Sequence, residues 1–141
     1  MDTRDVATEQ RNKDRIRAAF DAWAAGTGGP FGLLAEDATW TITGNAPVSR
    51  TFGSRQEFID TVIDPFNARM TEPLRPTVRG LYADGDWVIV LFDGAATARD
   101  GQPYRNTYTW YLRLSGDAVV EVIAFFDTIE FTDLWQRVSP G

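Results

Sequence analysis

Hydrophobic positions are densest between residues 87 and 127, where three runs rich in β-branched and aromatic residues follow one another. Two short segments with turn-forming residues separate these runs, Asp100–Pro103 and Ser115–Asp117. The Asp-Gly and Ser-Gly pairs in them supply the backbone conformations that a tight reversal needs. The pattern therefore predicts three long antiparallel strands folded as a meander. Because these strands are so hydrophobic, other elements of the fold must pack against one face of the meander.

A helical period precedes the meander, in the segment from Thr8 to Ala25, and glycines follow it directly. Its apolar residues recur at the spacing of one helix face, whereas the opposite face is charged. This apolar stripe consists of Ile16, Ala19, Phe20 and Trp23. Residues 1–8 are polar and aperiodic, so we expect them to be disordered ahead of a single domain at residues 9–138.

A second helix is predicted to begin at Ser54, because Ser54 and Glu57 have the spacing of a capping box. In this motif the Ser54 side-chain oxygen accepts the N–H of Glu57, and the Glu57 carboxylate accepts the N–H of Ser54. The apolar stripe of this helix consists of Phe58, Val62 and Phe66. Pro65 lacks an N–H, so it either kinks the helix or ends it one turn early.

Shorter patterns fill the remaining chain. One helical turn is expected at residues 31–35, a strand at 38–43, a further strand at 77–83, and a short tail at 131–138. Helices thus come first and antiparallel strands follow, which is typical of an α+β domain in which a curved sheet wraps around the helices. Such a sheet leaves a cone-shaped space for a ligand.

The amino-acid composition limits the catalytic groups, metal ligands and partners that this chain can have. The 141 residues include no cysteine and no histidine, which excludes thiolate or imidazole catalysis and the usual zinc ligands. The net charge of −6 and the lack of a basic run argue against nucleic acid as a partner. We see no apolar segment long enough to span a membrane and no signal core, so the cytoplasm is the expected location.

Four stretches resemble the nuclear-transport-factor-two-like, or SnoaL-like, superfamily, which includes ketosteroid isomerases, limonene epoxide hydrolase and polyketide cyclases. They are EDATWTITG at 36–44, FGSRQEFI at 52–59, DGQPYRNTYTWYLRL at 100–114 and VVEVIAFFDT at 119–128. The resemblance implies a cystatin-like α+β roll with a cone-shaped, mainly antiparallel sheet. It also implies a homodimer, a small hydrophobic molecule as ligand, and no cofactor.

The catalytic machinery of ketosteroid isomerases has no counterpart in this chain. The position of their Asp base corresponds to Ile42, and their donor Asp falls near Asn106 or Thr107. Phe20 and Trp23 occupy the helix stripe that carries their Tyr. The resemblance therefore does not extend to steroid-type isomerisation.

The acid–base set of limonene epoxide hydrolase is represented by one residue, Asp93. The partner Arg of that set corresponds to Leu91, and its second Asp to Ala124. Its water-positioning Tyr and Asn correspond to Trp40 and Ile42. Epoxide opening by two coupled carboxylates is not expected.

Asp93 is nevertheless the strongest catalytic candidate, because it is a carboxylate inside an otherwise apolar strand. If Asp93 shares a face with Leu91 and Ala95, it points into the cone, where it would act as a general acid or base. The alternative is that Asp93 starts a turn or bulge with Gly94 and faces water.

The next strand offers two polar residues, Asn106 and Tyr108, on the same face as Trp110. Under the resemblance this face lines the cone, where Asn106 and Tyr108 would orient a carbonyl or hydroxyl group. Plain packing of the strand against the helices is the alternative. The residues expected to line the substrate site are Trp40, Ile42, Phe20, Trp23, Leu91, Trp110, Ala124 and Phe126.

Two functions remain open at this point, besides a protein–protein adaptor, which would need an exposed apolar patch beyond the dimer face. One is a cofactor-independent isomerase, hydrolase or cyclase that acts on a small hydrophobic substrate, with Asp93 as acid or base and Tyr108 and Asn106 in support. The other is a non-catalytic ligand-binding or dimerisation module of the same fold. Two or more polar groups that converge inside the cone would favour catalysis, whereas an apolar cone would favour binding.

Overall fold

The structure is a computed structural model that describes the backbone of residues 3–141 and the side chains of residues 6–141. Six strands form one sheet in the order β2-β1-β6-β5-β4-β3. Their bounds are β1 Leu34–Ile42, β2 Thr51–Phe52, β3 Met70–Asp84, β4 Trp87–Ala98, β5 Pro103–Ser115 and β6 Ala118–Phe126. Neighbouring strands are antiparallel except for the parallel pair β1 and β6. The expected α+β class with a curved, mixed sheet is confirmed.

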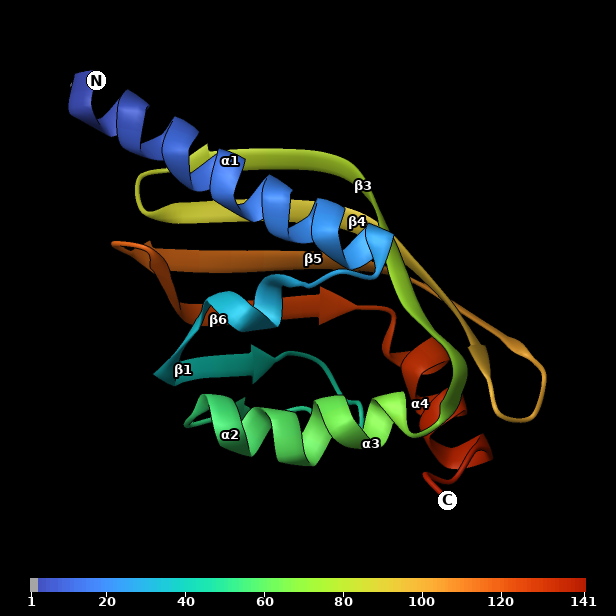
Figure 1. Ribbon diagram of the computed structural model, residues 1–141. Coiled ribbons are helices and arrows are strands. Elements are labelled where there is room, and N and C mark those ends of the chain that lie inside the picture. Colours follow the sequence, from blue (N-terminus) through green and yellow to red (C-terminus); the bar gives the residue numbers. More distant parts are fainter. Residues whose placement is uncertain (1–2) are drawn as a thin grey trace.

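The meander of β4, β5 and β6 has the predicted turns, with Gly101 and Gly116 at positive φ. Strand β3, by contrast, begins at Met70, well ahead of the predicted start at Thr77. Pro73 and Pro76 lie within this added part, where the pairing with β4 shifts register twice. Because β3 is an edge strand, only one of its sides pairs with another strand, so each proline removes few backbone hydrogen bonds from the sheet. The bulges at the register shifts let the strand bend over the helices. Figure 1 shows this bend.

Helix α1, Thr3–Ala25, lies across the inner face of β3 and β4 (Figure 1). It begins ahead of the predicted Thr8, so the part of the expected disordered segment from Thr3 onward is helical; residues 1–2 lie outside the described residues. Ile16 and Phe20 of its apolar stripe are buried in the core. The turn expected at 31–35 is the 3₁₀ helix η1, Pro30–Leu33, after which β1 begins earlier than expected.

A second helical layer covers β1, and it consists of α2 Arg55–Phe58, η2 Ile59–Ile63 and α3 Asp64–Asn67 (Figure 1). Ser54 caps its start as predicted, since Ser54 Oγ accepts the Glu57 N–H at 3.1 Å. Pro65 does not end the helix. The helix instead has one widened, π-type turn at η2, just ahead of the proline, and then continues to Asn67.

The tail predicted at 131–138 belongs to a helix, α4 Thr128–Arg137, capped by the Asp127 side chain. Arg69, which is 6% exposed, anchors this helix. Its guanidinium donates to the carbonyl oxygens of Val138, Pro65 and Trp135 and stacks on the Trp135 ring at 3.8 Å. Helix α4 is thereby held against the end of α3, where it closes one end of the core.

No helix in the part of the chain described here is long and apolar enough to cross a membrane.

Candidate functional site: an aromatic cavity inside the sheet

The concave face of the sheet and the helices enclose a cavity of about 370 Å³. Flat and branched apolar side chains from all layers of the fold form most of its wall. The lining residues are Trp23, Gly28, Gly29, Phe31, Gly32, Trp40, Ile42, Phe58, Val62, Ile63, Phe66, Asn67, Pro73, Leu74, Tyr108, Trp110, Ala124, Phe126 and Phe131. A volume near the lower end of the range for ligand sites fits a small molecule.

The wall carries no charged side chain within the described part of the chain. Its polar side-chain groups are the Tyr108 hydroxyl, the Asn67 amide and the indole nitrogens of three tryptophans. Asn67, Pro73 and Gly28 are exposed lining residues, so the opening lies between the loop after α1 and the start of β3. A ligand inside would therefore meet mainly aromatic surface.

The aromatic side chains of the cavity wall pack against one another through ring contacts. Trp40 stacks on Phe58 with centroids 4.1 Å apart and planes 13° apart, and Trp23 stacks on Trp110 at 5.7 Å and 20°. Trp40 and Trp110 meet edge to face at 4.9 Å. Such pairs are the preferred geometries of aromatic rings, and each adds about 0.5–1.5 kcal/mol beyond the buried area. These ring contacts thus fix the positions of the wall side chains before a ligand binds.

Tyr108 is the lining residue that carries a hydroxyl. Its ring stacks on Phe92 at 4.9 Å with planes 7° apart, and its Oη lies 2.7 Å from Tyr104 Oη. Burial raises the pKa of Tyr104 to about 12 and raises the pKa of Tyr108 well above its usual value. Both hydroxyls therefore keep their protons at neutral pH.

Asn106 lies behind these tyrosines rather than in the cavity wall. It is 6% exposed. Its Nδ2 donates to Tyr104 Oη at 2.8 Å and to the Asp127 carbonyl oxygen at 3.0 Å. Its Oδ1 accepts the backbone N–H groups of Thr107 and Asp127 at 2.8 and 3.0 Å. The amide thus ties β5 to the start of α4 and does not touch the cavity.

Most residues expected to bind substrate do line the cavity: Trp23, Trp40, Ile42, Trp110, Ala124 and Phe126, together with Tyr108. Phe20 does not, because it lies beneath the wall and packs against Phe92 at 4.9 Å and Trp110 at 5.7 Å. Leu91 does not either, because it lies on the opposite side of β4. The predictions that Phe20 and Leu91 line the cavity were therefore wrong.

The expectation that Asp93 points into the cone was also wrong. Asp93 does share a face with Leu91 and Ala95, but Val88, Val90 and Phe92 are the buried residues of β4 and define its inner face. The Asp93 side chain is 49% exposed and lies 3.5 Å from Arg79 on the outer face. It also accepts the Thr107 hydroxyl at 2.7 Å. Strand alternation alone allowed either face to be the inner one.

We therefore expect the Asp93→Asn variant to keep its fold and its ligand binding. The pair with Arg79 is exposed on both sides, and exposed pairs contribute about 0–1 kcal/mol. Urea unfolding should show a change in the free energy of unfolding within that range. A loss of ligand binding or a much larger destabilisation would contradict the placement of Asp93 on the outer face.

Several wall residues were not anticipated, and three of them carried a visible signal. Phe58, Val62 and Phe66 form the predicted apolar stripe of the second helix, and this stripe faces the cavity. Phe131 lines the cavity because α4 folds back and stacks it on Phe66 at 6.0 Å. Only the tertiary fold brings it there, so the local sequence held no such indication.

Residues 16–122 match the family model of the SnoaL-like domain. No curated protein sequence matches the chain.

Solved structures share the fold at low sequence identity. Bal32a, from a soil-derived mobile gene cassette, is 15% identical with a TM-score of 0.74 and covers 91% of this chain and 98% of its own. An NTF2-like protein from Burkholderia pseudomallei is 20% identical, with a TM-score of 0.71 over 87% of this chain and 95% of its own. IdmH from Streptomyces antibioticus, a proposed polyketide cyclase, is 19% identical, with a TM-score of 0.67 over 89% and 99%. At these identities the similarity establishes the fold.

Proposed function

Because the chain belongs to the SnoaL-like domain family, we propose that it binds a small, uncharged, flat apolar molecule in the aromatic cavity. The observation that carries this proposal is a wall with three tryptophans and, in the described part of the chain, no charged side chain. An ionised ligand would lose its hydration without gaining a partner of opposite charge, which is costly. A planar apolar ligand would instead bury its faces against the rings.

The pair fluorene and fluorene-9-carboxylate tests this proposal, because the two molecules share a planar ring system and differ in charge. We expect calorimetry at pH 7 to show one fluorene bound per chain. The carboxylate should bind at least about tenfold more weakly, which corresponds to a small part of the cost of burying an unpaired charge. Equal binding of both molecules, or no binding of fluorene, would contradict the proposal.

Catalysis is the second candidate, and the Tyr108 hydroxyl in the wall is the observation that favours it. The proposed cyclase among the similar structures is consistent with a cavity that folds an apolar substrate. Acid–base chemistry by a carboxylate has no support, since Asp93 lies outside the cavity. If a carbonyl substrate is turned over, Tyr108→Phe should abolish turnover, whereas Asp93→Asn should leave it unchanged.

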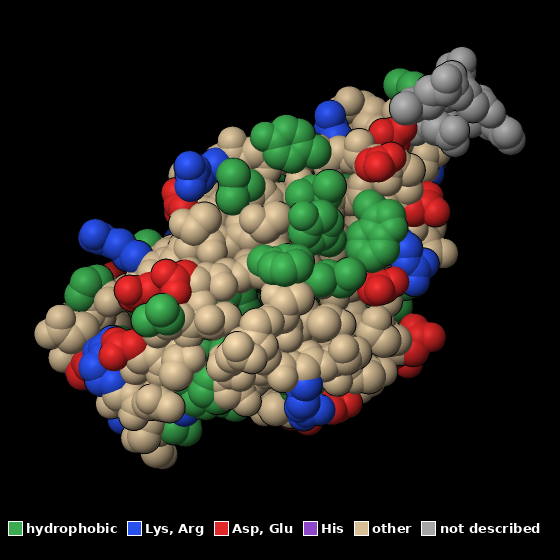
Figure 2. Space-filling view, turned by 180° about the vertical axis from the view of Figure 1, so that it is seen from behind, with side chains coloured by type: hydrophobic (Ala, Val, Ile, Leu, Met, Phe, Trp, Pro, Cys, Tyr) green, Lys and Arg blue, Asp and Glu red, His purple; other side chains and the backbone are tan. Residues whose placement is uncertain are grey.

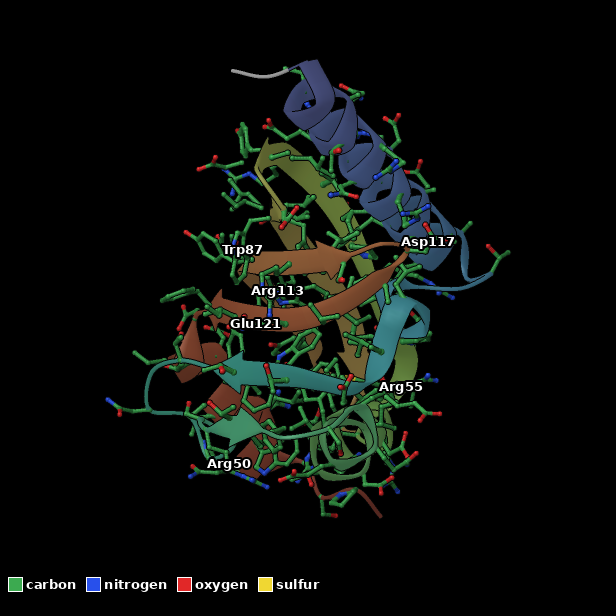
Figure 3. All side chains as sticks on the ribbon, turned by 90° about the vertical axis from the view of Figure 1, so that its left-hand side faces the viewer. Arg50, Arg55, Trp87, Arg113, Asp117 and Glu121 are labelled. Carbon is green, nitrogen blue, oxygen red and sulfur yellow. The ribbon has the colours of Figure 1, made fainter. Side chains whose placement is uncertain are left out.

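We also propose that the outer face of the sheet pairs with a second copy of the chain. Phe125 is 48% and Tyr82 is 58% exposed there, and Figure 2 shows the apolar patch to which they belong. The remaining apolar members of the patch, which are half-buried, are Trp87, Ile89, Leu91, Tyr111 and Ile123. Patches of this kind mark interaction surfaces. Figure 3 shows the polar rim beside Trp87, where Arg113 and Glu121 form an ion pair at 3.0 Å.

The substitution Phe125→Lys tests the dimer, because a charge placed in the patch would be buried without a partner in the dimer. We expect sedimentation to show a dimer for the native chain and a monomer for the variant at the same concentration. Ile129→Lys on α4 is the matched control, since Ile129 is 78% exposed and belongs to no sheet strand. A native chain that stays monomeric at all concentrations would refute the dimer.

A further inference from the structure

The orientation of the Asn106 amide is fixed by its neighbours. Its Oδ1 faces two backbone N–H groups, those of Thr107 and Asp127, and each is a donor. A flipped amide would place its own N–H₂ against both donors and leave the Asp127 carbonyl oxygen facing another oxygen. Nδ2 must therefore be the group that faces Tyr104, and it can only donate.

This orientation fixes the direction of the next hydrogen bond. Tyr104 Oη accepts from Asn106, and the residue is only 2% exposed. Within the described residues, the Oη of Tyr108 at 2.7 Å is the one acceptor within reach of the Tyr104 proton. If Tyr108 donated instead, the Tyr104 proton would be buried without a partner, whereas Tyr108 lines the cavity, where a ligand can accept its proton. Tyr104 therefore donates and Tyr108 accepts.

The proton of Tyr108 is then left without a partner from the described protein groups. Tyr108 is 6% exposed, and the cavity is the space that it borders. Gly94 lets the ring lie close to β4, since a Cβ at this position would come within 3.1 Å of Tyr108 Cε1. The stack on Phe92 holds the Tyr108 ring in this position.

We propose that Asn106 and Tyr104 act as positioning residues that make the Tyr108 hydroxyl a hydrogen-bond donor toward the cavity, so that the ligand is an uncharged carbonyl compound. This inference rests on the proposed binding of a flat, uncharged molecule. A chain of hydrogen bonds polarises its last member, so Tyr108 is a better donor than an isolated tyrosine. A planar ketone, aldehyde or quinone presents the matching acceptor, whereas a ligand that presents an N–H at this point meets another donor.

Three tricyclic probes of nearly the same shape separate these cases: 9-fluorenone offers an acceptor, fluorene offers neither group, and carbazole offers a donor. We expect native chain to bind fluorenone about three- to tenfold more tightly than fluorene, which is the range of one neutral hydrogen bond. Carbazole should bind no more tightly than fluorene. The infrared carbonyl stretch of bound fluorenone should move to lower wavenumber than in an apolar solvent.

Two conservative variants assign the effect to its residues. Tyr108→Phe should remove the preference for fluorenone and return the carbonyl stretch toward its value in apolar solvent. Tyr104→Phe should retain fluorene binding but reduce the preference for fluorenone over carbazole, because Tyr108 is then free to donate or accept. A merely structural role of Tyr104 would weaken all three probes equally and leave the carbonyl stretch unchanged.

The outcomes distinguish this inference from the function on which it rests. If none of the three probes binds, the proposed function fails and the inference fails with it. If fluorene and fluorenone bind equally, or carbazole binds more tightly than fluorene, the cavity is a ligand site but the assigned direction of the Tyr108 hydroxyl is wrong. If Tyr104→Phe leaves the preference and the carbonyl stretch as in native chain, Tyr104 has no positioning role.

Discussion

Replacing Ala124 by phenylalanine is expected to lower the affinity for fluorene by at least about tenfold, because a single extra methylene can already cost that much in a tight apolar site. Ala124 lies on β6 between Ile42 of β1 and Trp110 of β5, and all three side chains line the cavity. The new ring would extend into the space that the ligand needs. Calorimetric titration of the variant with fluorene measures the loss.

The same substitution should keep or raise the free energy of unfolding, since the added ring fills a cavity and buries apolar surface. Loss of binding combined with retained stability is the specific signature of a blocked cavity. Ala24→Phe is the matched control, because Ala24 is exposed on α1 and outside the wall. Unchanged fluorene binding by Ala124→Phe would show that the ligand binds elsewhere.

Phe92→Ala is expected to cost about 3–5 kcal/mol in the free energy of unfolding, the usual range for a fully buried phenylalanine. Phe92 is 0% exposed on the inner face of β4. Its ring lies 4.9 Å from the rings of Phe20, Tyr108 and Trp110, so it joins α1 to the cavity wall. Truncation removes these contacts and leaves a void that the rigid rings fill poorly. Urea or thermal unfolding measures the cost.

Phe92→Leu provides the comparison, since it retains most of the volume and should cost about 1.5 kcal/mol or less. If Phe92→Ala is no more destabilising than Phe92→Leu, then the aromatic cluster does not hold the wall. The two variants also report on Tyr108, which loses its stacking partner in both cases.

The periodic patterns predicted the elements well, because alternation and capping are local properties of the chain. The turns of the meander and the Ser54 half of the capping box are confirmed, whereas Glu57 accepts the N–H of Gly53 instead of that of Ser54. The start of β3 was missed, since prolines argue against a strand unless it lies at an edge, and edge position is a property of the whole sheet. Helix α4 was underestimated because its anchor, Arg69, lies far from it in sequence.

The site was predicted in part, for a physical reason that Asp93 illustrates. Alternation groups Asp93 with Leu91 but does not say which group of β4 faces the helices. The fully buried row of Val88, Val90 and Phe92 decides this only once the sheet is assembled. Asn106 and Tyr108 were correctly paired on one face, but their roles differ, because Tyr104 fills the space between the Asn106 amide and the Tyr108 hydroxyl.

The most direct test of the cavity as a ligand site is a titration of ¹⁵N-labelled protein with fluorene, followed by the indole N–H signals of its tryptophans. Trp23, Trp40 and Trp110 line the cavity, whereas Trp87 lies on the outer face of the sheet. We predict that the signals of the three cavity tryptophans move together with one saturation curve while that of Trp87 stays fixed. Movement of Trp87 alone, or of no indole signal, would contradict binding inside the sheet.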